Sequence, residues 1–330
     1  MKMKAALLAA IFIGSISFSS DAASRLEAHL YAGPAVMMTE NLFKDGDEAS
    51  RRFLLARSME ETGVSDSEEA KERLARLYET FASFGVLSRD YLCYVTGGED
   101  TNGFMRAGGV IGITKGAMER FSDDEAAFLL AHELAHGELG HEEKKLSRLI
   151  STDEALAVYM AKSGSEARRL AAGLLTRYEG DRDCTDKQEK EADRLALLLM
   201  MKAGCNPGGA LTAVRKLIAL RDEERQDEEK RFDALRSYME SLTDNAILLS
   251  KGRVSVHGVD ALFAGEKESE ASEQALRAFG ALVQIVYMNM SREVSYRDGG
   301  LYAGPVYIAE AGENGYMEAA RLRVSLMRGE

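Results

Sequence analysis

Residues 132–136 read H-E-L-A-H, and both the residue types and their spacing suit a metal site. In a helix, positions four apart lie on one face about one turn apart, so His132 and His136 can present ring nitrogens to one Zn²⁺ ion. Glu133 follows the first histidine directly, where its carboxylate can reach a water on that ion. The whole chain has five histidines, so a chance match is rare. The pattern predicts two ligands and a general base.

The metal motif needs a helix, and the residues before it provide a start signal. Ser122 and Glu125 have the spacing of a capping box, and the apolar stretch 126–134 follows. The motif then begins about two turns inside a buried helix. His141 lies five residues after His136, about 140° around an ideal helix. We therefore expect His141 at the surface or beside a ligand, not as a ligand itself.

A third ligand must come from another part of the chain, and one candidate lies on a second predicted helix. The sequence T-D-K-Q at 185–188 is a capping box and Gly204 is a stop signal, so 186–203 reads as one helix. Glu189 and Asp193 share a face of it, four residues apart. Glu189 can bind the metal while Asp193 accepts the N–H of a ligand histidine.

Glu154, in D-E-A-L-A-V-Y-M, is a second candidate for the third ligand. Zincins of the thermolysin and aminopeptidase kind carry their ligand glutamate on a helix nearly this close behind the second histidine. The spacing here is a residue or two short for them. On the residues alone, both glutamates remain open.

Several segments together resemble the zinc metallopeptidases that include the type I CAAX prenyl proteases, HtpX and soluble periplasmic proteases of Gram-negative bacteria. They are N-G-F-M-R-A-G-G-V-I-G-I-T-K-G at 102–116, S-D-D-E at 122–125, A-H-E-L-A-H-G-E-L-G-H at 131–141, E-K-E-A-D-R-L-A at 189–196 and A-G-C-N-P at 203–207. The resemblance implies that His132, His136 and Glu189 bind one Zn²⁺, that Glu133 is the base, and that Asp193 orients a ligand.

The sequence also departs from that family. Its members usually carry a His-Pro element some tens of residues after the last ligand, often followed by an arginine, and here only L-T-D-N-A-I-L stands at 242–248. His257 is the sole later histidine. It is expected as an exposed strand residue, with a latch or oxyanion role as the alternative. The charge run R-D-E-E-R-Q-D-E-E-K-R at 221–231 is interpreted as a solvated helix face.

Short β-prone pieces precede the metal motif at 91–95, 104–105 and 110–114, the last two joined by a turn at 108–109. An exposed edge of such a sheet can take an extended peptide as an extra strand. We assign this edge to Gly109, Val110, Ile111 and Gly112.

The predicted fold is α+β and mainly helical, with a gluzincin-like zincin core and a small sheet beside the H-E-x-x-H helix. The predicted organisation is a signal peptide at 1–22, a peptidase domain at 23–245 and a C-terminal α/β extension at 246–330. Further helices are expected at 47–63, 65–86, 270–291 and 313–328, together with a helical insertion at 142–180 that Gly164 and Gly180 interrupt, and one long helix or a broken pair at 208–243. A strand is expected at 252–259, and a hairpin at 294–309 with its turn at 298–300.

The N-terminus indicates where in the cell the protein is located. Lys2 and Lys4 precede an apolar run and a small-residue cleavage pattern, as in a secretory signal, which points to the periplasm. No other stretch predicts a membrane span. A net charge of −12 disfavours nucleic acid as a partner. The expected partners are polypeptide substrates and, by the family resemblance, outer-membrane assembly or quality-control proteins. Helix geometry disfavours a Cys184–Cys205 disulfide.

The leading functional prediction is a periplasmic zinc endopeptidase that hydrolyses unfolded or misassembled proteins, with one Zn²⁺ per chain. Two alternatives remain. One is a zinc-bearing chaperone-like or latched, inactive homologue, because the His-Pro element is missing. The other is an aminopeptidase-like zincin that uses Glu154.

Overall fold

The computed structural model describes residues 48–106, 108–145, 185–220, 225–262, 272–312 and 314–328. These residues form an α+β structure with a predominance of helix and three small sheets, as the sequence predicts. The predicted signal peptide at 1–22, Glu154, Cys184 and most of the predicted helical insertion at 142–180 lie outside the described residues.

Two helices open the described chain, close to their predicted positions. They are α3 (Glu48–Thr62) and α4 (Glu68–Ser83). Ser67 caps α4, since its Oγ accepts a hydrogen bond from the backbone N–H of Ala70. Leu74 and Phe81 bury one face of α4 in the core.

The first sheet, called sheet A, precedes the metal motif. It consists of β1 (Leu92–Thr96), β2 (Gly103–Arg106) and β3 (Val110–Thr114) in the spatial order β1-β3-β2. β3 pairs in parallel with β1 and antiparallel with β2. All five residues of β3 are buried, as expected for a central strand.

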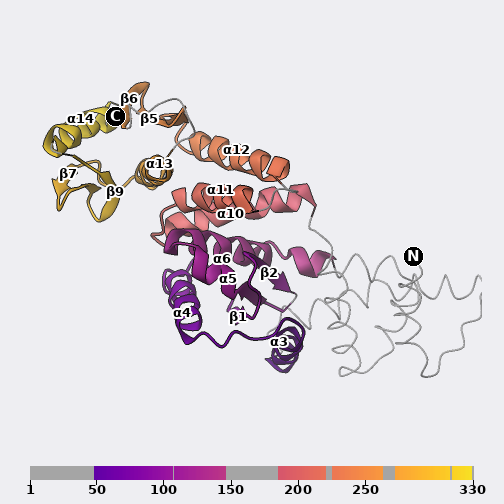
Figure 1. Ribbon diagram of the computed structural model, residues 1–330. Coiled ribbons are helices and arrows are strands. Elements are labelled where there is room, and N and C mark those ends of the chain that lie inside the picture. The colour runs from indigo at the N-terminus through magenta and orange to yellow at the C-terminus, as the bar shows by residue number, and fades with distance from the viewer. Residues whose placement is uncertain are drawn as a thin grey trace, which may run out of the picture.

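A layer of helices covers sheet A and carries the metal motif. A short helix, α5 (Lys115–Arg120), leads from β3 into α6 (Asp123–Glu138). Two further helices, α10 (Asp186–Lys202) and α11 (Gly208–Leu220), pack against α6, and α12 (Arg225–Ser241) packs against α11. In Figure 1, α6 lies between α4 and β2 on one side and α10 and α11 on the other.

The chain ends in a region from β4 to α14, called the C-terminal region. A meander of β4 (Ile247–Ser250), β5 (Arg253–Val256) and β6 (Val259–Leu262) comes first, and α13 (Glu273–Tyr287) follows. A second meander of β7 (Val294–Arg297), β8 (Gly300–Ala303) and β9 (Val306–Glu310) precedes α14 (Gly315–Met327). Positive φ angles of 51° at Asp298 and 78° at Gly299 make the predicted hairpin turn.

The C-terminal region is joined to the helical layer by one continuous apolar core. The backbones of α11 and α13 touch where two glycines meet: a Cβ built on Gly280 would lie 2.1 Å from the backbone nitrogen of Gly208. The side chain of Asn206 reinforces this contact, because its Nδ2 donates a hydrogen bond of 3.0 Å to the carbonyl oxygen of Arg277. Only glycine at both positions allows so close an approach.

Candidate metal centre

Helix α6 carries the metal motif, and the motif is buried in the protein. Its start is fixed as predicted: the Glu125 carboxylate accepts a 2.7 Å hydrogen bond from the backbone N–H of Ser122. His132, Glu133 and His136 are each less than a tenth exposed. Buried imidazoles and a buried carboxylate are costly to desolvate, so their partners decide what they can do.

The structure brings His132, His136 and Glu189 together. The two Nε2 atoms lie 3.1 Å apart. The Glu189 carboxylate approaches both, with Oε2 lying 3.2 Å from Nε2 of His132 and Oε1 lying 3.6 Å from Nε2 of His136. Two segments that are 53 positions apart in sequence thus close a triangle of one carboxylate and two imidazoles.

This triangle fits a tetrahedral zinc ion. Bonds of about 2.0–2.2 Å in tetrahedral geometry place neighbouring ligand atoms roughly 3.3 Å apart. The 3.1 Å between the two Nε2 atoms and the 3.2 Å from Oε2 of Glu189 to Nε2 of His132 are close to that value, and one ligand atom from each of the three side chains lies within 4.8 Å of the others. Two histidines and one glutamate are also a known ligand set of catalytic zinc, which leaves a fourth position open.

Asp193 lies behind the first histidine, where the sequence places it. Its Oδ1 is 2.9 Å from Nδ1 of His132. Arg231 on α12 holds the same carboxylate with two bonds: Nη2 to Oδ1 at 2.6 Å and Nε to Oδ2 at 2.9 Å. The bidentate grip orients Asp193, and Asp193 orients His132 so that its Nε2 points into the triangle.

The ligand triangle, Glu133, Asp193 and Arg231 form one cluster of charged and polar side chains. Arg231 is the member of this cluster that sequence reasoning missed. It closes the charge run at 221–231, which was interpreted as a solvated face, but the Arg231 side chain is only 25% exposed. The available signal was its place on α12, because Arg231 stands four residues before Leu235 and eight before Met239, both buried. The chain therefore supplies an arginine some tens of residues after Glu189 even though the His-Pro element is absent.

His141 is buried beside the second histidine. Its Nδ1 lies 3.0 Å from Nδ1 of His136, and it is 1% exposed. The prediction that it is no ligand agrees with this position. The angular argument for that prediction was unsound, however, because α6 ends at Glu138 and Gly140 turns the chain with φ 62°.

The surroundings shift the pKa values of the two histidines in opposite directions. Burial opposes protonation of His132, but hydrogen bonds to Asp193 and Glu189 outweigh it and raise its pKa to about 10. Burial and the positive His132 lower the pKa of His136 to about 3. In the absence of metal, His132 is a cation that offers Nε2–H, and His136 is neutral and can accept it.

Glu133 is poised to exchange a proton near neutral pH. Burial raises its pKa to about 7, and the neighbouring Glu189 adds to the rise against the opposing charge of His132. Its carboxylate lies against β2, since a Cβ built on Gly103 would be 3.2 Å from both Cγ and Oε1 of Glu133. A general base works best with such a pKa.

The strand assigned to substrate binding is wrong. Val110, Ile111 and Gly112 belong to β3, whose two edges are taken by β1 and β2, and Gly109 lies in the turn before it. The error arose because the parallel β1–β3 pair joins segments that are not neighbours in the chain. Among the described residues, β2 is the edge strand of sheet A beside Glu133.

The structure does not bring His257 to the cluster. This residue turns the chain between β5 and β6 with φ 48°, and its backbone N–H donates to the carbonyl oxygen of Ala246. Figure 1 shows β5 and β6 at the end of the molecule away from β2. The latch and oxyanion roles considered for His257 gain no support from this position.

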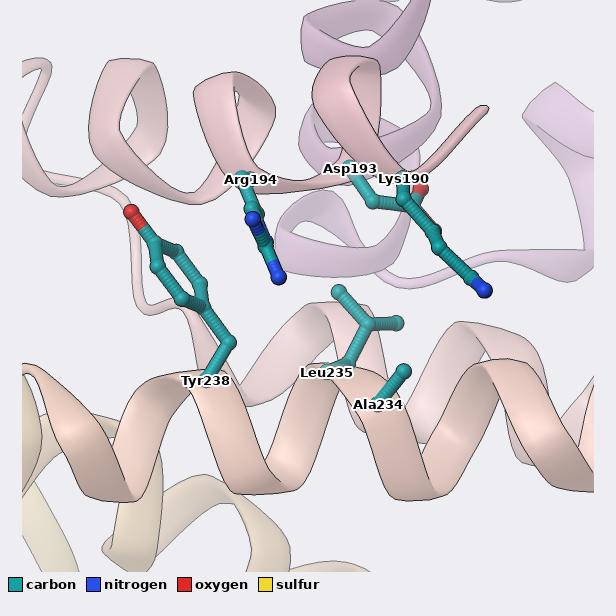
Figure 2. Close-up of a pocket in the computed structure, with 6 residues that line it drawn as sticks. All are labelled: Lys190, Asp193, Arg194, Ala234, Leu235 and Tyr238. Carbon is teal, nitrogen blue, oxygen red and sulfur yellow. The ribbon is translucent and has the colours of Figure 1, made fainter. Parts of the chain in front are cut away.

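A small pocket lies between α10 and α12 (Figure 2). Its lining residues are Lys190, Asp193, Arg194, Ala234, Leu235 and Tyr238. Asp193 alone among them takes part in the cluster. Arg194 lies over the ring of Tyr238, 5.3 Å from the centroid, so the pocket belongs to the packing of the two helices.

Comparisons with known proteins agree with this geometry. The family model described as peptidase family M48 matches residues 67–264, more than half of the chain. Metalloprotease LoiP of Escherichia coli (strain K12) is 31% identical over 127 residues, which cover 38% of this chain and 50% of LoiP. Metalloprotease YcaL of the same strain is 26% identical over 160 residues, 48% of this chain and 62% of YcaL.

The chain thus spans between half and two thirds of the length of these two curated relatives. The matched family region begins just before α4, contains both segments of the ligand triangle and runs past the predicted boundary at 245 to the residues after β6. The resemblance inferred from the motifs is confirmed: the chain belongs to peptidase family M48.

Proposed function

We propose that this protein is a zinc-dependent endopeptidase. The observation that carries the proposal is the triangle of His132, His136 and Glu189 with Glu133 beside it, supported by the family membership. Zn²⁺ held by these three side chains would supply Lewis-acid chemistry, which lowers the pKa of water and polarises a carbonyl oxygen.

Glu133 is proposed to act as the proton carrier. It takes a proton from the attacking water as the new C–O bond forms, and delivers it to the amine nitrogen as the C–N bond breaks. Water and an amide thereby become a carboxylic acid and an amine. The pKa of about 7 suits a group that must accept and then release the same proton.

The substrate is proposed to lie as an additional strand along β2. The N–H of Thr114 donates to the carbonyl oxygen of Asn102, so Asn102 turns inward to β3. Because antiparallel pairing alternates, the backbone groups of Gly103 and Met105 point outward from the sheet. An extended peptide bound to them runs past Glu133, and main-chain recognition gives loose sequence preference.

That preference suits unfolded or misassembled polypeptides, and the signal-like N-terminus suits the periplasm. Both remain part of the proposal, as do outer-membrane assembly or quality-control partners. No helix among the described residues has the length and hydropathy needed to cross a bilayer.

The test of the proposed activity is cleavage of casein by zinc-loaded protein. Glu133→Gln should abolish cleavage while zinc remains bound, because glutamine cannot carry the proton. Glu79→Gln, an exposed position on α4, is the matched control and should keep full activity. Full zinc occupancy in the native protein with no cleavage of any unfolded protein would favour the inactive, chaperone-like alternative.

A further inference from the structure

The second ligand histidine is supported by a different device from the first. His132 contacts a carboxylate, whereas the ring of His136 meets the ring of His141 with their centroids 5.0 Å apart. The two Nδ1 atoms are 3.0 Å from each other, within hydrogen-bond distance. His141 is 1% exposed, so solvent does not compete for this contact.

The far nitrogen of His141 faces α10. Nε2 of His141 lies 3.5 Å from Oε2 of Glu191, and among the described residues it has no hydrogen-bond partner of normal geometry. Glu191 stands two residues after Glu189, about 200° around α10 from it. In the structure it lies beside His141, with Lys187 on its other side at 3.7 Å.

Only one arrangement of protons leaves His136 able to bind a metal. Its Nε2 faces the ligand triangle and must offer a lone pair there, so its hydrogen must sit on Nδ1. That Nδ1–H then donates to Nδ1 of His141, and His141 keeps its own hydrogen on Nε2, toward Glu191. The reverse order would place a hydrogen on Nε2 of His136, inside the triangle.

We propose that His141 is a positioning residue which, with Glu191, holds His136 in its metal-binding tautomer. The proposal rests on the proposed zinc site. It assigns α10 three roles: Glu189 closes the triangle, Asp193 orients His132, and Glu191 orients His136 through His141. Partners of this kind change metal affinity about 10- to 100-fold when removed from zinc proteins.

Zinc affinity, measured by competition with a chelator, tests the assignment. His141→Leu removes the acceptor and should weaken zinc binding about 10- to 100-fold. His141→Asn restores an acceptor oxygen near the position of Nδ1 and should bind within a few-fold of the native protein. Glu191→Gln should have a smaller effect than His141→Leu. His257→Asn is the matched control and should bind as the native protein does.

Native zinc affinity in a folded His141→Leu would overturn the assignment, and so would failure of His141→Asn to recover affinity. Thermal denaturation of the zinc-free variants checks that each is folded.

A second measurement needs no substitution. Nitrogen-15 spectra of histidine-labelled, zinc-loaded native protein should show His141 protonated at Nε2 and His136 at Nδ1. A His141 protonated at Nδ1 would overturn the assignment. If the native protein binds zinc with these tautomers but cleaves no polypeptide, the proposed activity fails and the positioning role stands. A native protein that binds no zinc would overturn both.

Discussion

The metal-site helices and the C-terminal region bury different kinds of side chain. Helices α6, α10 and α12 enclose ionisable groups, among them His132, Glu133 and Asp193. From β4 onward, the buried polar side chains of the described residues are Gln284 and Ser325, neither of which is charged at neutral pH. Pairing of buried charges is therefore important in the metal-site helices, whereas the described part of the C-terminal region depends on apolar packing.

The difference shows where folding and chemistry conflict. Burying Glu133 and His132 costs free energy that packing cannot return, and pairs such as Asp193–Arg231 offset only part of it. Among its described residues, the C-terminal region buries no side chain that is charged at neutral pH. It should therefore respond to changes of shape, whereas the metal-site helices should respond to changes of charge.

The largest effect should follow Glu133→Gln, which removes one buried charge. Cleavage should fall about 10²- to 10⁴-fold, the usual contribution of a general base. The same change should stabilise the zinc-free protein. Its Glu133 pKa of about 7 lies above the ordinary 4.5, so native stability falls as the pH rises from 4.5 to 7, where the unfolded chain has already released the proton.

Denaturation of zinc-free protein at several pH values measures this second effect. Above pH 7 the variant should be more stable than the native protein by about 2–3 kcal/mol, and the gain should vanish below pH 4.5. A gain that is independent of pH would show that ionisation of Glu133 is not its source.

Arg231→Met should be the next largest change, and it tests whether charge pairing holds the metal-site helices. It leaves the carboxylate of Asp193 buried with His132 as its sole remaining partner among the contacts described above, which should cost about 3–5 kcal/mol of unfolding free energy. Lys230→Met on the same helix is the matched control, because Lys230 and its partner Asp227 are both exposed, so the change should leave stability nearly unchanged. Equal losses, measured by chemical denaturation, would contradict the special role of Arg231.

Gly280→Ala tests whether the C-terminal region responds to a change of shape. The new methyl group meets the backbone of Gly208, so α11 and α13 must separate, at a cost of about 1–3 kcal/mol. Gly312→Ala has open space around it and should be nearly neutral. Zinc affinity of the folded Gly280→Ala protein should be unchanged, and a large loss would show that the two parts are coupled.

Strand addition at β2 predicts a periodic effect on substrates. A peptide substrate N-methylated at one position at a time should lose about threefold to tenfold in cleavage wherever the methyl replaces an N–H bonded to Gly103 or Met105. Sensitivity should alternate along the substrate with a period of two residues. Uniform sensitivity at all positions would argue against pairing with an edge strand.

The smallest effect is expected for Tyr316→Ala on α14. This side chain is 75% exposed and its ring contacts only Tyr296 among the aromatic residues described, at 4.9 Å between centroids. Denaturation should show a change within about 0.5 kcal/mol and cleavage should be unaffected. A larger loss of stability would mean that the outer face of α14 packs more tightly than its exposure indicates.

Sequence reasoning predicted what depends on near neighbours. The starts of α6 and α10 follow from capping boxes at Ser122 and Thr185, and helical spacing places Glu189 on the same side of α10 as Asp193. The hairpin turn at Asp298 was equally local.

What the sequence did not reveal depends on contacts between distant segments. The central position of β3 requires its parallel pairing with β1 across the β2 hairpin. Arg231 meets Asp193 across 38 positions, and helical spacing to Leu235 and Met239 indicates only that it lies on the buried side of α12, not which residue it contacts. The contact between His141 and Glu191 depends on how α10 docks on the end of α6.

The glycine contact between α11 and α13 limits which C-terminal segments of related proteins could replace the one in this chain. Gly208 lies within the matched family region and Gly280 lies beyond it, yet the two residues are in contact in the structure. A chimera that grafts another tail after residue 264 would need a residue without a side chain opposite Gly208. The two positions should therefore be inherited as a pair.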